Sequence, residues 1–339
     1  MIIQKDFPLS QILWYEIGGK AQYLLEVEKA EDVEEALDFV EKNKIQRVLV
    51  VGLGSNIIIT DDYFQGAVIR IVQHQSCHSR ERGRPHEVHS ALVVNPLGTI
   101  KGEFITVFAG TTLDNLITFS LVNNLTGLEW AGGLPGTVGA GIRGNVGAFG
   151  KEIKDNLFSV DVIKRKNKGY IHKTLKKSDL HFSYRNSLVK ENKNLIIISA
   201  TFKLQPANPQ TLALVEKIYK TNINYREKHH PLEYPTCGSV FKNISESDHV
   251  QKIISIWPDV KELVNTKWHG KVSMGYIIGR LGFSGYRIGN MQVSQKHNNF
   301  IVNLGAGKAR DVITIIKKIQ NKVHETFGFL PEVEVEIVK

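Results

Sequence analysis

Apolar residues recur with a helical period in three parts of the chain. In residues 31–43 the apolar positions follow an i, i+3, i+4, i+7 spacing. Acidic residues crowd the first turn of this segment, where the helix dipole favours them. A similar stripe in residues 113–121 predicts a second helix, which ends near Gly127. The strongest stripe covers residues 312–323, and Gly328 follows at a position typical of a helix C-terminus.

Short apolar runs between these segments predict β-strands. They cover residues 47–51, 57–60, 67–72, 104–109, 157–164 and 195–204. Helices and strands are therefore mixed along the chain, and the sequence contains neither an internal repeat nor a low-complexity stretch. We expect four successive parts, with a linker at 205–210. These parts are residues 1–73, 74–210, 211–328 and 329–339.

Composition narrows the class of protein. The 339 residues include 42% apolar and 23% charged residues, which is typical of a folded globular protein and excludes disordered and collagen-like chains. Two cysteines, Cys77 and Cys237, exclude a disulfide framework and fit a reducing cytoplasm. The first residues lack the pattern of a signal peptide, and no apolar run reaches the ~18 residues of a membrane span. We therefore expect a cytoplasmic protein that does not insert into membranes.

A formal net charge of +9 leaves three kinds of partner open. They are nucleic acid, an anionic membrane surface and a phosphorylated small molecule. Nucleic-acid binders usually interleave basic clusters with aromatic residues, whereas the best basic run here, residues 164–168, is short. The sequence thus favours a phosphate-bearing small molecule over nucleic acid.

Three glycine-rich loops are the first candidate binding elements. Gly52-x-Gly-Ser-Asn56 follows a predicted strand, and glycine lets a backbone approach a pyrophosphate closely while Ser and Asn add donors. The loop lacks the third glycine of a dinucleotide fingerprint and the Gly-Lys-Ser/Thr of a Walker A loop. Residues 134–139 and 144–150 repeat the mixture of glycine and small polar residues. Together the loops favour backbone wrapped around a flat or phosphorylated ligand, with tight turns of a barrel-like sheet as the alternative.

Eight motifs occur in an order that resembles a known family. They are Ile17-Gly-Gly, Gly52-x-Gly-Ser-Asn56, Gly127-Leu-Glu, Leu134-Pro-Gly-Thr-Val-Gly, Asn145-x-Gly-Ala-Phe-Gly, Tyr184-Arg-Asn-Ser187, Cys237-Gly-Ser-Val-Phe-Lys-Asn243 and Val293-Ser-x-Lys-His297. This succession is similar to that of the UDP-N-acetylenolpyruvoylglucosamine reductases, also called UDP-N-acetylmuramate dehydrogenases. It extends from about Ile17 to Val335 and so covers almost the whole chain.

The resemblance implies an α+β fold. A two-part FAD-binding module of the vanillyl-alcohol-oxidase type would occupy residues 1–73 and 74–210, followed by an α+β substrate domain (211–328) and a terminal strand (329–339) that carries a catalytic Glu. It also implies non-covalent FAD, NADPH as co-substrate, no metal, and a monomer. The implied FAD-binding residues are Gly52, Gly54, Ser55, Asn56, Pro135, Gly136, Thr137, Gly139, Asn145 and Gly147.

The implied reaction reduces UDP-N-acetylglucosamine enolpyruvate to UDP-N-acetylmuramate, a peptidoglycan precursor. NADPH reduces the flavin, the reduced flavin passes a hydride to C3 of the enolpyruvyl group, and C2 is protonated. Two alternatives remain: another flavin oxidoreductase of the same superfamily, and a non-catalytic relative that binds UDP-sugars. Flavin that bleaches with NADPH and recovers with the enolpyruvate distinguishes the reductase from both.

Three residue types carry the expected chemistry. Hydride addition moves negative charge toward the substrate carboxylate, and Arg185, which matches the family's catalytic Arg, suits a carboxylate with its planar guanidinium. Ser239 matches the proton donor to C2 and, as a weak acid, needs a charged neighbour or a water relay. Glu332, Glu334 and Glu336 alternate with apolar residues, which places them on one face of a predicted strand. The spacing from Phe-Gly selects Glu334 as the assisting residue, whereas matching on Pro-Glu-Val selects Glu332.

Four residues are candidate substrate contacts. Lys242 and Lys271 could pair with the UDP diphosphate, Asn243 with an amide or a sugar hydroxyl, and Tyr184 with the nucleotide. Cys237 is not required for this chemistry, and we expect a small buried residue there rather than a nucleophile.

Three features depart from the family pattern. Asn186 stands where the family usually has Asp, which leaves the orientation of Arg185 open. Residues 245–264 resemble inserted helices. Residues 74–102 form a longer connection than usual, whose His and Cys spacing could hold zinc, although an exposed hairpin is favoured. The His and Cys residues concerned are His74, Cys77, His78, His86 and His89.

Overall fold

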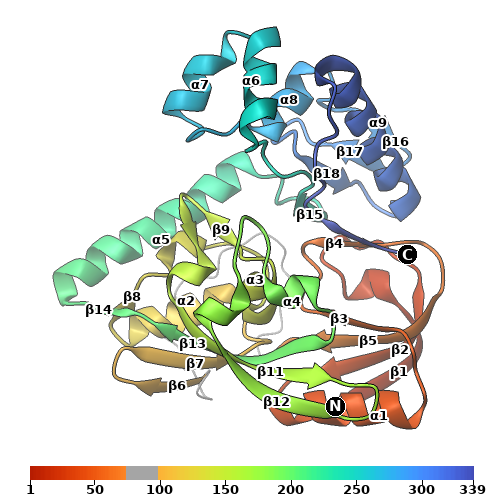
Figure 1. The fold of residues 1–339 in the computed structure, drawn as a ribbon, viewed down its shortest axis with the longest axis vertical. Helices are drawn as coiled ribbons and strands as arrows, with labels where there is room; N and C mark the ends of the chain where they lie inside the picture. Colours follow the sequence, from red (N-terminus) through yellow and green to blue (C-terminus); the bar gives the residue numbers. More distant parts are fainter. Residues whose placement is uncertain (74–97) are drawn as a thin grey trace. The chain divides into compact units, whose positions relative to one another are not determined.

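The computed structural model describes residues 1–73 and 98–339 (Figure 1). These residues form two compact units. Unit 1 comprises Met1–Phe7, Ala21–Leu53 and Phe64–Lys228, and unit 2 comprises Pro8–Lys20, Gly54–Tyr63 and His229–Lys339. Two short N-terminal segments therefore fold with the C-terminal third of the chain.

Unit 1 begins with a four-stranded sheet in the order β1-β2-β5-β3. Its strands are β1 (Ile2–Pro8), β2 (Lys20–Val27), β5 (Phe64–Ile71) and β3 (Val48–Val51). Because β5 pairs in parallel with both β2 and β3, the chain needs a crossover, which α1 (Ala30–Lys42) supplies. The apolar stripe of α1 is buried in the core, as its spacing predicts.

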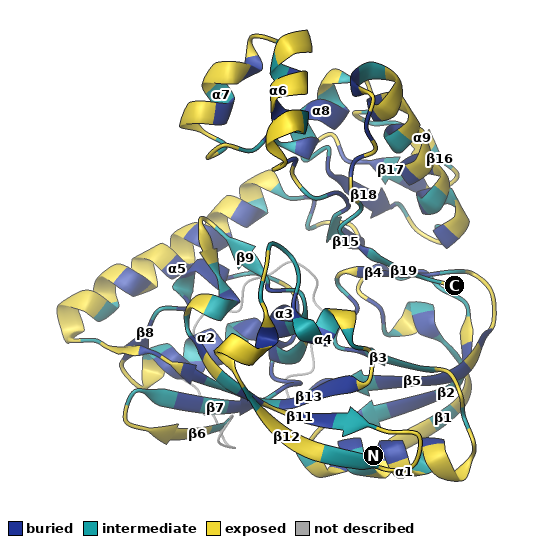
Figure 2. Cartoon of the chain, viewed as in Figure 1, coloured by how far each residue is buried: buried dark blue, intermediate teal, exposed yellow. Residues whose placement is uncertain are grey.

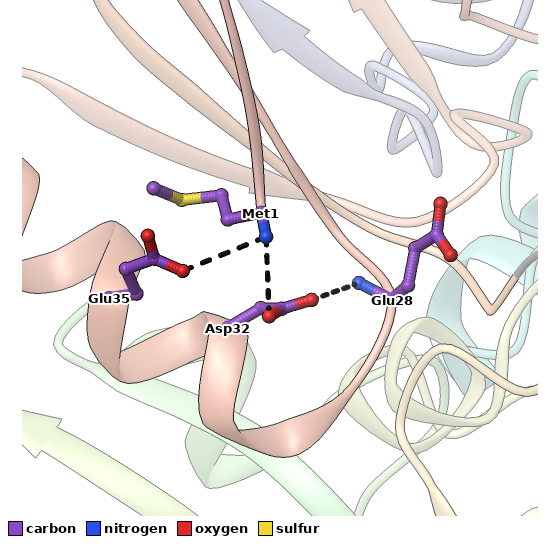
Figure 3. A network of polar contacts seen from close by, with 4 residues as sticks. All are labelled: Met1, Glu28, Asp32 and Glu35. Carbon is purple, nitrogen blue, oxygen red and sulfur yellow. Dashed lines mark hydrogen bonds and ion pairs between the residues drawn. The ribbon is translucent and has the colours of Figure 1, made fainter.

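One buried carboxylate ties α1 to the first strand (Figure 3). A carboxylate oxygen of Asp32 accepts a hydrogen bond from the backbone N–H of Glu28 at 3.1 Å. The other oxygen lies 3.3 Å from the α-ammonium group of Met1, which is also 3.6 Å from the Glu35 carboxylate. Since a buried charge without a partner is costly, these contacts explain how α1 holds an acidic residue on its buried side.

The rest of unit 1 is a five-stranded antiparallel sheet, in the order β12-β11-β13-β7-β6, with helices around it. The strands are β6 (Gly98–Lys101), β7 (Phe104–Phe108), β11 (Leu157–Arg165), β12 (Tyr170–Lys176) and β13 (Leu195–Lys203). The helices are α2 (Leu113–Val122), α3 (Val138–Arg143), α4 (Leu188–Glu191) and α5 (Pro209–His229). Two short pairs join β8 (Leu125–Thr126) to β14 (Gln205–Pro206) and β9 (Gly147–Ala148) to β10 (Lys151–Glu152). A single apolar core runs through both sheets, and β5 and β13 are the strands with the most buried residues, drawn in dark blue in Figure 2.

Unit 2 is built on an antiparallel sheet in the order β15-β18-β17-β16. The strands are β15 (Thr236–Ser239), β18 (Phe300–Asn303), β17 (Met291–Val293) and β16 (Arg287–Ile288). The helices are α6 (Ser247–Ile256), α7 (Val260–Thr266), α8 (Met274–Arg280) and α9 (Ala309–Phe327). A separate parallel pair joins β4 (Ile57–Ile59) to β19 (Glu336–Val338). Single 3₁₀ turns lie at Leu9–Gln11, Glu129–Ala131, Ile153–Asp155 and Lys177–Leu180.

Most of the predicted elements are confirmed, with ends shifted by a few residues. The three apolar stripes are α1, α2 and α9, and each predicted strand range contains a strand. Gly328 ends α9 in the left-handed conformation with φ +74°, and its N–H bonds to the His324 carbonyl. The predicted insertion at 245–264 is helical and forms α6 and most of α7.

Two predictions are wrong. Residues 332–336 do not form one strand, because the chain bends at Val335 and β19 begins only at Glu336. Residues 205–210 are not a free linker, since Gln205–Pro206 pairs with β8 and α5 begins at Pro209. Helix α5 lacks a clear apolar stripe because polar residues, Asn222 and Arg226, lie on its buried face.

Two findings concern the described residues alone. No helix within 1–73 and 98–339 has both the length and the apolar character needed to cross a membrane. Over the same ranges, no three His, Cys, Asp or Glu side chains gather as a candidate metal site. The zinc candidates His74, Cys77, His78, His86 and His89 lie outside the described residues.

Candidate active site

Two of the glycine-rich loops meet in unit 1. A Cβ atom on Gly52 would lie 2.5 Å from the Thr137 hydroxyl oxygen, so only glycine allows this contact. Thr137 is buried and caps α3 by accepting a hydrogen bond from the Ala140 N–H. A Cβ atom on Gly139 would lie 2.9 Å from the Ala109 Cβ, and the Gly139 N–H donates to the Ala109 carbonyl at 2.8 Å. The end of β3 and the start of α3 thus form one tight backbone layer.

The remaining residues of the first loop belong to unit 2. Gly54 adopts φ +69° and packs on Leu13, and the Asn56 carbonyl accepts the N–H of Glu336. The Ser55 carbonyl lies near Gly238, the residue that precedes Ser239. Within unit 2, Ser55 is therefore close to the candidate proton donor.

Asn145 is the central residue of the third loop. It is fully buried with φ +43°, a conformation that Asn tolerates better than most residues. Its Nδ2 donates to the Ser183 carbonyl at 2.9 Å. Its Oδ1 is buried without a hydrogen-bond partner among residues 1–73 and 98–339. A buried acceptor of this kind is costly unless a ligand satisfies it.

Arg185 lies beside this loop on a tight turn closed by two backbone hydrogen bonds between Ser183 and Asn186. Its φ is +56°, and its guanidinium donates to the Gly147 carbonyl at 2.8 Å and to the Asn145 carbonyl at 3.5 Å. The Asn186 amide instead donates to the Glu191 carboxylate at 2.6 Å. Backbone carbonyls of the third loop therefore orient Arg185, and Asn in place of Asp at 186 leaves those contacts intact.

Ser239 lies at the end of β15, after Gly238 with φ +77°. The following residues are held from two sides. Asn299 accepts the Val240 N–H at its backbone carbonyl, and its side-chain amide makes hydrogen bonds of 3.0 and 2.8 Å to the N–H and carbonyl of Phe241. On the other side, the Glu334 N–H donates to the Val240 carbonyl at 2.8 Å. The backbones of Ser239 and Glu334 thus come together within unit 2.

The two competing glutamates differ in their contacts. The Glu332 carboxylate forms an ion pair with the Lys242 ammonium, and the Glu332 carbonyl accepts the Lys242 N–H at 3.0 Å. The side chain of Glu332 is 63% exposed, whereas Glu334 is only partly exposed. The two glutamates thus lie in different surroundings, and the choice of Glu334 as the assisting residue stays a prediction.

The other candidate substrate residues are divided between the units. Tyr184 lies in unit 1, with its ring centroid 5.3 Å from the Arg185 guanidinium carbon. In unit 2, the Asn243 side-chain oxygen accepts the N–H of Met274 at the start of α8, and the N–H of Lys271 bonds to the Trp268 carbonyl. One acceptor position of the Asn243 side-chain oxygen is therefore used to hold the start of α8.

Cys237 is a structural residue. It is 1% exposed and lies beside the buried hydroxyl of Tyr15. Burial raises the pKa of the Cys237 thiol to about 12, so the thiol stays protonated near neutral pH. The expectation of a small buried residue rather than a nucleophile is confirmed.

Sequence reasoning missed two supporting residues, Asn299 and Lys190. Asn299 holds the segment after Ser239, and the Lys190 ammonium donates to the Arg185 carbonyl at 2.9 Å. Asn299 lies in an Asn-Asn-Phe sequence and Lys190 lies in a short polar helix. Neither local sequence indicates these contacts.

The glycine-rich loops of unit 1 and the separate α+β unit are the architecture of an FAD-dependent oxidoreductase, and residues 21–174 match the family described as FAD binding domain. Residues 230–338 match the family described as UDP-N-acetylenolpyruvoylglucosamine reductase, C-terminal domain. The chain belongs to the UDP-N-acetylenolpyruvoylglucosamine reductase family.

Full-length relatives support this assignment. The chain is 33% identical over 334 residues to the UDP-N-acetylenolpyruvoylglucosamine reductase of Caldicellulosiruptor saccharolyticus, covering 98% of this chain and 91% of that protein. It is 31% identical to the reductase of that name from Lactobacillus acidophilus, covering 99% and 95%. The crystal structure of the enzyme from Thermus caldophilus matches the whole of both chains with a TM-score of 0.72 at 23% identity, which shows a common fold.

The family establishes the activity. The chain is an FAD-dependent oxidoreductase that reduces UDP-N-acetylenolpyruvoylglucosamine with NADPH in peptidoglycan synthesis. The predicted α+β fold, the FAD-binding module, the cofactors and the reaction are confirmed.

The residues present suit FAD. Gly52 and Gly139 permit a close backbone layer at the end of β3, as a cofactor wrapped in backbone requires. The Oδ1 of Asn145, which has no hydrogen-bond partner within the described part of the chain, offers a buried acceptor, and FAD carries N–H and O–H donors.

Proposed function

We propose that Arg185, Ser239 and Glu334 carry out the second half of the reaction, in which the enolpyruvyl double bond gains a hydride and a proton. Bound FAD supplies the hydride, taken from NADPH, to C3 of the enolpyruvyl group. The protein must then stabilise the charge that develops at C2 and the carboxylate, and must deliver a proton to C2. This division of tasks gives each of the three residues a separate test.

The observation that carries the proposal is the position of Arg185. Arg185 has a left-handed backbone with φ +56°, and its guanidinium donates hydrogen bonds to the carbonyls of Asn145 and Gly147. Strained residues persist where the surrounding structure over-determines them, and they cluster at active sites. A fixed guanidinium can bind the substrate carboxylate in a bidentate manner and stabilise the enolate.

Ser239 is proposed to give its hydroxyl proton to C2, and Glu334 to assist the return of a proton to Ser239. Support comes from the backbone hydrogen bond between Glu334 and Val240, which brings the two residues to one place in unit 2. A serine hydroxyl is a poor acid on its own, so a nearby carboxylate that relays protons, directly or through water, meets a chemical need.

The remaining substrate residues are proposed to bind the UDP portion. Lys242 is largely buried and paired with the exposed Glu332, so a diphosphate would compete with Glu332 for its ammonium group. Asn243 and Lys271 are proposed to contact sugar or phosphate groups, and Tyr184 the nucleotide. The FAD-binding roles of Gly52, Gly54, Ser55, Asn56, Pro135, Gly136, Thr137, Gly139, Asn145 and Gly147 are proposals of the same kind.

Anaerobic half-reactions test the three roles. Flavin absorbance should bleach with NADPH and return with UDP-N-acetylglucosamine enolpyruvate. Ser239→Ala and Glu334→Gln should bleach normally, but their recovery should slow by about 10²–10⁴-fold, the usual contribution of a general acid or base. Glu332→Gln is the matched control and should stay within about threefold of the parent, because an exposed ion pair contributes little. Normal recovery in Glu334→Gln together with slow recovery in Glu332→Gln would exchange the roles of the two glutamates.

Four further proposals concern the location, the oligomeric state, the absence of nucleic-acid binding and the domain boundaries. The enzyme acts in the cytoplasm as a monomer without binding nucleic acid, which fits a reaction that consumes NADPH and a nucleotide-sugar. The division into two FAD-binding parts, a substrate domain and a terminal segment is proposed from the sequence at 73/74, 210/211 and 328/329, whereas the compact units place residues 211–228 with unit 1. Sedimentation at micromolar concentration measures the oligomeric state directly.

A further inference from the structure

The turn that carries Arg185 is fixed at both of its ends. At one end the Asn145 amide donates to the Ser183 carbonyl, and at the other the Ser187 hydroxyl donates to the Arg143 carbonyl at 2.7 Å. Ser187 is fully buried and also caps α4, since its Oγ accepts the Lys190 N–H. The chain therefore enters the turn and leaves it at defined points.

Between these points Arg185 must keep a left-handed backbone, which is unfavourable for a residue with a side chain. The guanidinium contacts with the third loop fix the end of the side chain. The peptide unit that follows Arg185 is held on its N–H side, because the Asn186 N–H donates to the Ser183 carbonyl at 3.1 Å. A contact at the Arg185 carbonyl would hold the other side of the same peptide unit.

Lys190 supplies that contact. Its ammonium group reaches back from α4 and donates to the Arg185 carbonyl at 2.9 Å, and the side chain is partly buried. A hydrogen bond with a charged donor is about twice as strong as one between neutral groups. The neighbouring Glu191 accepts a hydrogen bond from Asn186 at 2.6 Å and forms a second, exposed clamp.

We propose that Lys190 is a positioning residue for catalysis: its hydrogen bond holds the Arg185 carbonyl, and thereby keeps the guanidinium where the substrate carboxylate binds. The Asn186–Glu191 hydrogen bond assists in the same task. The inference rests on the proposed role of Arg185.

The test measures the two half-reactions separately in Lys190→Met, Lys190→Arg and the exposed control Lys193→Met. In Lys190→Met the reoxidation of flavin by the enolpyruvate should slow by about 10- to 100-fold at saturating substrate, as expected for a displaced catalytic group. Its reduction by NADPH should not change. Lys190→Arg should recover most of the rate, because a guanidinium can donate to the same carbonyl, and Lys193→Met should match the parent.

Three results would overturn the proposal. They are equal slowing of both half-reactions, no slowing of either, and a change confined to the apparent dissociation constant of the enolpyruvate. The last result would identify Lys190 as a substrate contact.

A double variant separates this inference from the proposed function. If Arg185→Ala slows reoxidation and Arg185→Ala/Lys190→Met slows it no further, Lys190 acts through Arg185. An additive loss would contradict that route. If Arg185→Ala reoxidises at the parental rate, the proposed function of Arg185 is wrong, whatever Lys190→Met shows.

The second clamp gives an independent test, which also applies if Lys190→Met folds poorly. Asn186→Asp would set two carboxylates against each other and should slow reoxidation by a few fold. Adding Glu191→Gln should restore the rate, because the new amide can donate to the new carboxylate. If the double variant Asn186→Asp/Glu191→Gln reoxidises no faster than Asn186→Asp alone, the proposed role of the Asn186–Glu191 hydrogen bond is wrong.

Discussion

Arg185 and Ser239 are held in place by different means. Arg185 lies on a strained turn whose supports come mainly from a short stretch, residues 183–191, and from one glycine-rich loop. Ser239 lies at the end of a regular strand, and the residues after it are held by Asn299 and by residues 332–334, which are 58 or more positions away in sequence.

This difference has consequences for energetics. The turn that carries Arg185 can loosen without unfolding unit 1, because its contacts lie largely outside the apolar core. The segment after Ser239 cannot loosen in this way, because Val240 and Phe241 are both 1% exposed and belong to the core of unit 2. Substitutions around Arg185 should therefore affect rate more than stability, and those around Ser239 should affect both.

Asn299→Ala should have the largest effect and would break the support of Ser239. It leaves the N–H and carbonyl of Phe241 without their side-chain partner inside the core, which should cost about 2–4 kcal/mol in the free energy of unfolding. Denaturant titration measures this loss, and reoxidation by the enolpyruvate should slow as well. Lys190→Met should change stability by less than about 1 kcal/mol, and a larger change would remove the contrast between the two regions.

The pH dependence of stability gives a smaller effect that is confined to unit 2. The folded state raises the pKa of Cys237 to about 12 because the thiol is buried, whereas the unfolded thiol titrates near 8.5. Between these values only the folded state keeps the proton, so the stability contributed by this group is complete below about pH 8.5 and falls as the pH rises, by at most about 1.4 kcal/mol per pH unit. Urea titrations from pH 8 to pH 10.5 should show this fall in the parent protein.

The matched variant is Cys237→Ala, in which the fall above pH 8.5 should be shallower while activity at neutral pH is retained. Equal slopes in the two proteins would show that Cys237 is not the group responsible. A large loss of activity at neutral pH would contradict its structural role.

The ion pair between Lys242 and Glu332 should have the smallest effect on stability. A double-mutant cycle with Lys242→Met and Glu332→Gln should give a coupling energy of about 0.2–1 kcal/mol, since Glu332 is largely exposed. The coupling should decrease further in high salt. A coupling energy well above this range would mean that the ion pair, together with the backbone hydrogen bonds, holds the C-terminal segment in place.

The sequence predicts the elements with strong periodicity and the residues that occur in ordered motifs. The stripe of α9 and the glycine that ends it are examples, because apolar spacing and a left-handed end are local properties. Arg185, Ser239 and Glu334 are proposed site residues, taken from motifs whose fixed order resembles that of one family.

Long-range contacts are what the sequence could not supply. Nothing in residues 8–20 and 54–63 indicates that they fold with the C-terminal third of the chain. The alternation of Glu332, Glu334 and Glu336 predicts one strand, but pairing with residues 240–242 on one side of Val335 and with β4 on the other bends the chain. The role of Asn299 depends on a partner 58 residues away, which no local pattern encodes.

The pairing of β4 with β19 also sets an order of events during synthesis. Ile57 leaves the ribosome about 280 residues before its partner Glu336, which at about 5–20 residues per second is a delay of roughly 15–60 s. Throughout that interval the apolar residues 57–59 have no strand to pair with and must be shielded from other nascent chains. The late arrival of residues 332–338 completes the backbone contacts of the segment after Ser239, so a polypeptide truncated by premature termination would lack these contacts even if unit 1 had already folded.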